Sequence, residues 1–495
     1  MNHDEHSLPN DIRRTAQLGI FWSIIQSWGG KLVAFGLSIL LARLLSPEEF
    51  GIASAAALVL MLIPMVAEFG FGDAILQRQN LKSRDINLPF YFSIGIVAVL
   101  VLVVTLMSGD ISVWLGKPEL AFYVMMIAGT MIINTLTQFQ EAVYKRKLAF
   151  RTLALRTLNA NLLGGATAVV CAGAGFGIWS FVAQAYVASL IGLLWLWWRP
   201  QWKPGLELNP LAFRQMLRFG LPIVGQRLVD FAGSRFIDLL IVSQLGLALY
   251  GVYIVGSKLY LTMMELLQGA LYSVSLTVLS TIASDRERTA NIYLKTIGLS
   301  SAFVSPVFVM VSVLSPEICH VLFGEKWQGV DDVAMVLLLL GAIQCVQYMN
   351  AAFLGARGRP EINLIAGTVK TVSPILGLLL LPTGELHLLV TIFVVGQLMA
   401  TPVSFYFVSR ELGLSALHIV RTLAPAVANG MVSFLSVTYA RPYIALLNLN
   451  TFWQGVALGG IYVLVWLVLI AALDHTRFRA MGALVMTKLR QKSQI

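Results

Sequence analysis

The feature that most limits what this chain can fold into is a long succession of apolar runs. A helix needs about 20 mostly apolar residues to cross a bilayer, and the chain is 57% hydrophobic and only 12% charged over its 495 residues. Such runs satisfy their own backbone hydrogen bonds in lipid when they are helical. We therefore predict an all-α polytopic membrane protein with about fourteen transmembrane helices, which begin near Gln17, Gly51, Leu88, Pro118, Thr152, Phe176, Phe219, Gly251, Tyr293, Val333, Asn363, His387, Leu417 and Phe452.

The basic residues are distributed unevenly between the loops that alternate along these spans. Loops on one side carry most of the Lys and Arg, whereas loops on the other side hold only Arg43, Lys117, Lys326 and Arg441. Cytoplasmic loops of membrane proteins carry an excess of these residues. The pattern predicts that both termini are cytoplasmic, and it explains the net charge of +10 without any nucleic-acid partner.

Two segments near the N-terminus have counterparts about 200 residues later in the chain. LGIFWSIIQSWGGK from Leu18 resembles FGLPIVGQRLVDFAG from Phe219, and LARLLSPEEFG ending at Gly51 resembles IVSQLGLALYG ending at Gly251. Each copy would contain an even number of spans, so the copies would run parallel, related by an axis along the membrane normal. The repeat predicts two helical bundles that face a central cleft.

We expect the chain to divide according to this repeat. The expected parts are an N-terminal six-helix bundle at 1–198, a second six-helix bundle at 199–412, two additional transmembrane helices at 413–474 and a basic cytoplasmic tail at 475–495. The tail combines bases with an apolar face. It fits either a short amphipathic helix held by anionic lipids or a segment without fixed structure.

The predicted seventh span, Phe219–Leu245, contains charged residues within an otherwise apolar run. Each charge at the centre of a span costs roughly 2.5–3.5 kcal/mol on insertion scales. At about 100° per residue, Arg227, Asp230, Arg235 and Asp238 lie within an arc of roughly 140°. Two interpretations stay open: pairs spaced i,i+3 that only lower the insertion cost, or an ionic face toward a hydrated cavity.

Two other spans also contain charged residues. Lys31 lies near the middle of the first span without a carboxylate within one turn of its own helix, and Lys258 and Glu265 lie seven residues apart in the eighth. Such residues are typical of a charge-lined cavity in a transporter for a charged substrate. The candidates for substrate binding are Lys31, Arg227, Arg235 and Lys258, and the candidates for ion coupling are Asp230, Asp238 and Glu265.

An enzyme, such as a membrane glycan polymerase, ligase or glycosyltransferase, is a competing class. Those reactions would be expected to use a sizeable periplasmic loop or a cytoplasmic carboxylate cluster for a metal, and the loops here are too short for an extramembrane domain. The adjacent pair Asp331 and Asp332 falls on the periplasmic side, and no His or Cys set has metal-ligand spacing. We therefore predict a protein that is not an enzyme, with no catalytic residues, metal or cofactor.

Several motifs occur in a fixed order along the chain. They are LARLLSPEEFG after the first span, EFGFGDAILQRQ at the exit of the second, KRKLAFR in a later loop, and SPEI followed by VLFGEKWQGV after the ninth. In this order and over essentially the full length, the chain resembles polysaccharide transporters of the Wzx type. These belong to the multidrug/oligosaccharidyl-lipid/polysaccharide exporter superfamily.

The resemblance implies a flippase that moves undecaprenyl-pyrophosphate-linked oligosaccharide repeat units across a bacterial inner membrane by alternating access. The SPEEFG and FGEKW motifs favour exopolysaccharide over O-antigen. Implied partners are the lipid-linked oligosaccharide, inner-membrane lipids, a polysaccharide polymerase and a chain-length regulator. A pyrophosphate head group would need cations along its path, which the four candidate substrate-binding residues would supply.

A cation-coupled multidrug exporter of the same superfamily is the second alternative. Such an exporter would be expected to carry acidic residues in its first bundle and about twelve spans in total. Here the first span carries Lys31, and two further spans follow the repeated core. A lysine repels the cationic drugs that these exporters usually handle, so the sequence favours the polysaccharide transporter.

Overall fold

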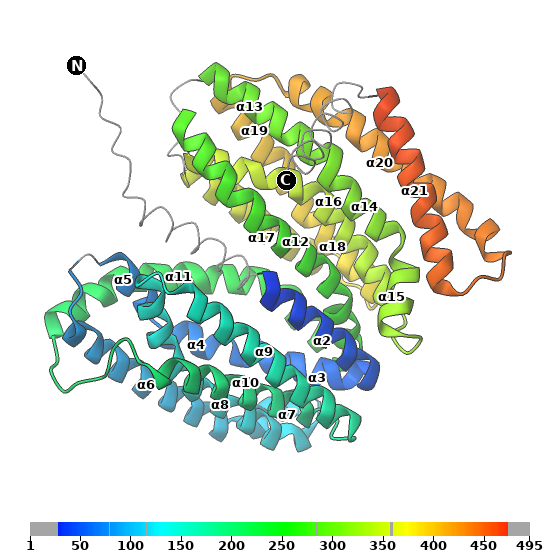
Figure 1. Cartoon of the computed structure of the whole chain (residues 1–495). Helices are drawn as coiled ribbons and strands as arrows, with labels where there is room; N and C mark the ends of the chain where they lie inside the picture. The colour runs from blue at the N-terminus through cyan, green and yellow to red at the C-terminus, as the bar shows by residue number, and fades with distance from the viewer. Residues whose placement is uncertain (1–27, 79, 115, 283–285, 357–359, 474–495) are drawn as a thin grey trace, which may run out of the picture. The chain divides into compact units, whose positions relative to one another are not determined.

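Figure 1 shows the computed structural model, which describes residues 28–78, 80–114, 116–282, 286–356 and 360–473. Within these ranges the regular structure is helical and contains no strand. Among the described residues, 10 helices are long and apolar enough to cross a membrane. The predicted all-α polytopic class is confirmed, and the count of about fourteen spans stays a prediction. The start of the first span near Gln17 and the tail at 475–495 lie outside the described residues.

The chain forms two compact units, residues 1–251 and 252–495. The helices described in the first unit are α2 (Gly30–Leu44), α3 (Pro47–Leu60), α4 (Leu62–Ala67), α5 (Phe71–Gln77), α6 (Ser83–Leu106), α7 (Ser108–Trp114), α8 (Ala121–Arg146), α9 (Phe150–Gly173), α10 (Trp179–Trp198) and α11 (Pro210–Leu240). A π-helical turn, Ile241–Leu245, extends α11. The division into bundles at 1–198, 199–412 and 413–474 stays a prediction.

The spacing of Ser and Glu in SPEEFG has a local structural role. Ser46 ends the preceding loop in an extended conformation and caps α3, since its hydroxyl accepts a hydrogen bond from the Glu49 backbone N–H at 3.3 Å. The Glu49 carboxylate accepts in return from the Ser46 backbone N–H at 2.7 Å. Pro47 occupies the first helical position, where no N–H is needed. This capping box fixes the residue at which α3 begins.

Gly51 and Gly251, the two glycines that end the repeated segments, each pack against the backbone of the helix that carries the other, within the first unit. A Cβ on Gly51 would lie 1.7 Å from the Leu247 carbonyl oxygen, and a Cβ on Gly251 would lie 1.8 Å from the Pro47 carbonyl oxygen. Only residues without a side chain allow backbones to approach this closely. The start of α3 therefore packs directly on the start of α12 (Leu247–Ile282).

An aromatic core holds α5, α6, α8 and α11 together within the first unit. Phe71 is fully buried and belongs to a cluster with Phe90, Phe139, Trp202 and Met216. The Trp202 indole N–H donates to the Ser83 carbonyl at 3.0 Å, so the loop before α11 is fastened to the start of α6. This core sets the position of α5 against α11.

The second unit contains the remaining helices. They are the rest of α12, then α13 (Arg286–Leu299), α14 (Ser305–Val313), α15 (Ser315–Phe323), α16 (Val330–Ala356), α17 (Pro360–Leu380), α18 (Leu386–Leu398), α19 (Ala400–Leu412), α20 (Ala416–Ala445) and α21 (Thr451–Leu473). A π-helical turn, Ser300–Val304, joins α13 to α14.

The glutamate of the SPEI motif has a structural role in this unit. Glu317 on α15 is 6% exposed, and its two carboxylate oxygens accept hydrogen bonds from the Arg441 guanidinium on α20 at 2.9 and 3.1 Å. Arg441 also donates to the Val313 carbonyl. A bidentate pair of this kind holds α20 to α15 with defined geometry.

Polar residues inside the second unit bind one another across its helices. Tyr260 donates to Gln344 at 2.6 Å, and Gln344 donates to Gln397 at 2.9 Å. Tyr293 donates in the same way to Asn350, at 2.6 Å. These side chains satisfy each other between helices, as polar residues commonly do in membrane bundles.

Candidate functional site

The charged face of α11 contacts the short helix α5 and the residues before it. The Arg227 guanidinium donates to the Glu68 carboxylate at 3.0 Å and to the Asp73 carboxylate at 2.7 Å. Glu68 follows α4, Asp73 lies in the first turn of α5, and all three residues belong to the first unit. Arg227 is thus held between two carboxylates, which leaves the cluster with an excess negative charge.

Backbone geometry places these carboxylates beside α11. The chain turns between α4 and α5 through Phe69 and Gly70, which have positive φ angles of 45° and 66°. At the same turn, a Cβ on Gly220 of α11 would lie 1.8 Å from the Phe69 carbonyl oxygen. The turn and α11 can approach this closely because Gly220 has no side chain. The contact brings the start of α5 within reach of Arg227.

The other predicted charges of α11 behave differently from one another. Arg235 donates to Asp238 at 3.2 Å, which is one of the two i,i+3 pairs considered from the sequence. Asp238 is 2% exposed, and its other oxygen, Oδ1, has no hydrogen-bond partner among the described residues. Asp230 is exposed, and the structure pairs Arg227 with Glu68 and Asp73 instead of Asp230.

The remaining candidates lie on α2 and α12. Lys31 is half-buried at the second residue of α2 in the first unit. Lys258 is half-buried on α12 in the second unit, and Glu265 is exposed on the same helix about two turns further on. Convergence of Lys31 and Lys258 on one cavity, and their binding of substrate, stay predictions.

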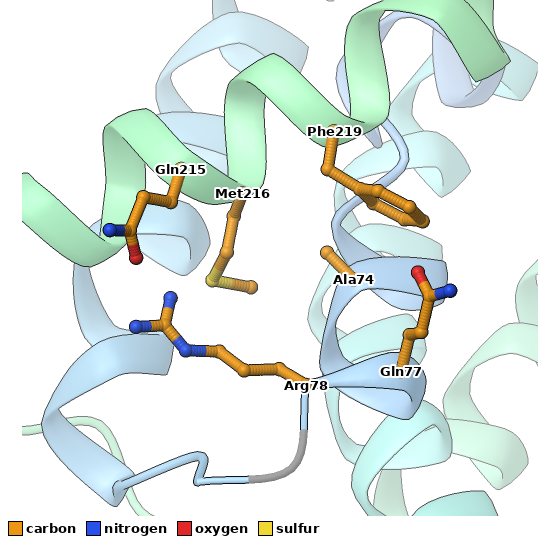
Figure 2. A pocket seen from close by; sticks show the side chains of 6 residues that line it. All are labelled: Ala74, Gln77, Arg78, Gln215, Met216 and Phe219. Atoms are coloured by element: carbon orange, nitrogen blue, oxygen red, sulfur yellow. The ribbon is translucent and has the colours of Figure 1, made fainter.

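A pocket lies at the other end of α5, between that helix and α11. Its volume is about 320 Å³, and it is lined by Ala74, Gln77, Arg78, Gln215, Met216 and Phe219. Figure 2 shows the Arg78 side chain extending along the pocket below α11, with Met216 and Gln215 on the helix above it. The pocket was not predicted from the sequence, because α5 is too short to show a helical pattern.

A comparison with family models identifies the chain more closely. The model described as "Polysaccharide biosynthesis protein" matches residues 40–332, more than half of the chain. The chain belongs to this family. The matched region includes the turn before α5, α11 and all of α12.

Similar proteins are known from bacteria. The "Succinoglycan biosynthesis transport protein ExoT" of Rhizobium meliloti is 24% identical over 326 residues, which cover 66% of this chain and 66% of ExoT. The "Lipopolysaccharide biosynthesis protein WzxC" of Escherichia coli K12 is 21% identical over 370 residues, which cover 73% of this chain and 74% of WzxC. The resemblance to Wzx-type polysaccharide transporters is confirmed.

The fold has a counterpart among solved structures. The chain is similar to the "Lipid II flippase MurJ, inward closed conformation", with a TM-score of 0.71 and 14% sequence identity. The likeness covers 92% of this chain and 98% of the MurJ chain. The chain therefore has the fold of this lipid II flippase.

Proposed function

We propose that the protein is a flippase that moves undecaprenyl-pyrophosphate-linked oligosaccharide repeat units across the bacterial inner membrane for exopolysaccharide biosynthesis. The observation that carries this proposal is the family match over residues 40–332, together with relatives named for succinoglycan transport and lipopolysaccharide biosynthesis. Charges within membrane helices cost free energy and typically pair with one another or line the path of a polar substrate, so their presence on α2, α11 and α12 supports the proposal further.

In the proposed cycle, the cationic residues Lys31, Arg227, Arg235 and Lys258 bind the pyrophosphate as it passes through the bilayer. In the described conformation, two of the five N–H groups of Arg227 donate to Glu68 and Asp73. A two-point contact between Arg227 and a phosphate would compete with these carboxylates, which links head-group binding to the position of α5. Asp230, Asp238 and Glu265 are the proposed groups for coupling to an ion.

The flippase function is tested in cells that lack the protein. We expect such cells to lose secreted polymer and to accumulate the lipid-linked oligosaccharide on the cytoplasmic leaflet, where a lectin added to spheroplasts does not reach it. Restoring the wild-type chain should return both signals. Lectin labelling at the wild-type level in the deletion cells would exclude the flippase function, and intact labelling without polymer would indicate a polymerase.

The same assay tests Lys31 and Lys258 as ligands of the head group. Lys31→Ala and Lys258→Ala should each reduce lectin labelling by about tenfold at unchanged membrane abundance, since a charge-assisted hydrogen bond to phosphate is lost. Substitution by Arg should restore part of the signal because the positive charge is kept. Lys203→Ala, at an exposed loop position, is the matched control. Normal labelling in both membrane variants would exclude the head-group role, and loss of the protein would indicate a structural one.

We also propose that the protein lies in the inner membrane with both termini in the cytoplasm. The distribution of basic residues between loops supports this orientation. Reporters fused after Ile495 and after Asn80 should give cytoplasmic signals, and a reporter at Gly329 should give a periplasmic one. A periplasmic signal from the Ile495 fusion would require an odd number of spans. A polymerase and a chain-length regulator are the proposed partners, to be sought by cross-linking in intact cells.

A further inference from the structure

The pocket between α5 and α11 combines one cation, two amides and an apolar wall. Arg78, Gln77 and Gln215 supply the polar groups, while Phe219 supplies apolar surface beside the buried Met216. Its volume of about 320 Å³ falls in the range of pockets that hold small ligands. This mixture suits a molecule with a charged head and an apolar chain.

The Arg78 guanidinium is available to a ligand. Within the described residues, its side chain makes one hydrogen bond, from Nη1 to the Ala212 carbonyl at 3.5 Å, the long limit for such a bond. Its planar set of N–H groups matches phosphate oxygens in a two-point contact. Most of its donors therefore remain free to bind an anion.

Hydrogen bonds hold the backbone of Arg78 in place, although its side chain makes only one long hydrogen bond within the described residues. The Arg146 guanidinium on α8 donates to the Ile75 carbonyl at 2.6 Å and to the Arg78 carbonyl at 2.5 Å. These bonds satisfy carbonyl groups at the end of α5 that have no partner within that short helix. The side chain of Arg78 thus extends from a rigid point into the pocket.

The charges around the pocket favour an anion. None of the residues that line it is acidic, and Arg227 offsets one of the two negative charges of Glu68 and Asp73 at the opposite end of α5. Arg214 and Arg218 lie on the same end of α11 and are exposed. Basic pockets beside membrane helices on the cytoplasmic side bind phosphate-bearing lipid head groups.

We infer that this pocket binds the phosphate of a lipid at the cytoplasmic surface of the membrane. Arg78 contacts the phosphate oxygens, the amides of Gln77 and Gln215 donate to the head group, and the exposed ring of Phe219 lies along the lipid chain. The inference rests on the proposed cytoplasmic placement of α5. The phosphate belongs either to the lipid carrier of the proposed substrate, for which the pocket is a first docking position, or to an anionic phospholipid.

Lipid binding to the purified full-length protein tests this inference without any transport step. The protein is placed in nanodiscs of phosphatidylcholine, and affinity is measured for undecaprenyl pyrophosphate and for phosphatidylglycerol. Arg78→Gln should weaken binding of whichever of these two lipids the wild-type pocket binds, by about tenfold. Arg84→Gln removes an equal charge from an exposed position nearby and should change the affinity less than about twofold.

A second variant protects the test against loss of the fold. Gln215 is exposed, so Gln215→Glu should fold normally while it places a carboxylate at the pocket and weakens phosphate binding to a similar extent. Preference for undecaprenyl pyrophosphate identifies the substrate carrier as the source, and equal affinities identify the bulk phospholipid. Unchanged affinity for both lipids in both variants overturns the inference. Because the assay measures lipid affinity and not transport, it tests the pocket even if the proposed flippase function is wrong.

Discussion

Replacement of Arg227 by Gln should remove nearly all polymer export and most of the protein from the membrane. The substitution leaves Glu68 and Asp73 close together without the guanidinium that now binds both. Removing one partner of a fully buried ion pair costs about 3–5 kcal/mol, and because Arg227 and Asp73 are 38% and 40% exposed, solvent screening places the expected cost below this range, at about 1–3 kcal/mol. That cost is a large fraction of the stability of an ordinary protein.

A variant series separates pairing from substrate binding at this position. The triple variant Arg227→Gln, Glu68→Gln, Asp73→Asn carries no charge in the cluster, so it should recover membrane abundance. If Arg227 also binds pyrophosphate, the triple variant should be abundant and still fail to export polymer. Arg218→Gln, an exposed arginine on the same helix, is the control for loss of one positive charge.

Polymer secretion at matched protein levels decides between the two roles. Full recovery of secretion in the triple variant would show that Arg227 serves only to hold α5 on α11. Normal abundance and normal secretion of Arg227→Gln would contradict the observed ion pairs themselves. An abundant triple variant without secretion supports the proposed binding of the head group.

Much of the fold was predictable because its main determinants are local in the sequence. The apolar runs indicate helices by their length. The SPEE segment contains the Ser46 and Glu49 spacing of a capping box, so the start of α3 is a local property. The repeat singled out Gly51 and Gly251, and these residues turn out to allow close backbone contact.

The site was predictable only in part, because side-chain partners depend on tertiary contacts. The Arg235–Asp238 pair follows from helical spacing. Arg227 was expected to pair with Asp230 or a substrate, yet its partners Glu68 and Asp73 lie 159 and 154 residues away in the sequence. No periodicity connects residues so far apart. The exposed carboxylate of Asp230 shows that spacing permits a pair without requiring it.

The helix α5 escaped prediction for a different reason. It has seven residues, Phe71–Gln77, which is too short for a periodic pattern to identify. The motif EFGFGDAILQRQ contains the glycine at which the chain turns and the acidic residues that bind Arg227. The motif therefore contained the residues of the site, but nothing in the motif indicated that they would contact α11.

Gly220→Ala should disrupt the protein strongly although it adds only one methyl group to α11. The added Cβ would lie 1.8 Å from the Phe69 carbonyl oxygen and 3.1 Å from the Gly70 Cα. These are backbone atoms of a turn whose φ angles are already positive, so they cannot move aside as a flexible side chain does. Overpacking costs about 1–3 kcal/mol or more in well-packed interiors, and membrane abundance and polymer output should fall by about tenfold.

Gly225→Ala supplies the matched control on the same helix. A Cβ at Gly225 would meet no atom within 4 Å, and Ala is favoured over Gly inside a helix by about 1 kcal/mol. This variant should therefore keep normal or slightly raised abundance and normal export. If Gly220→Ala behaved like Gly225→Ala, α5 would not pack closely on α11. The ion pairs of Arg227 and the Arg78 pocket would then lose their common structural basis, because both depend on that contact.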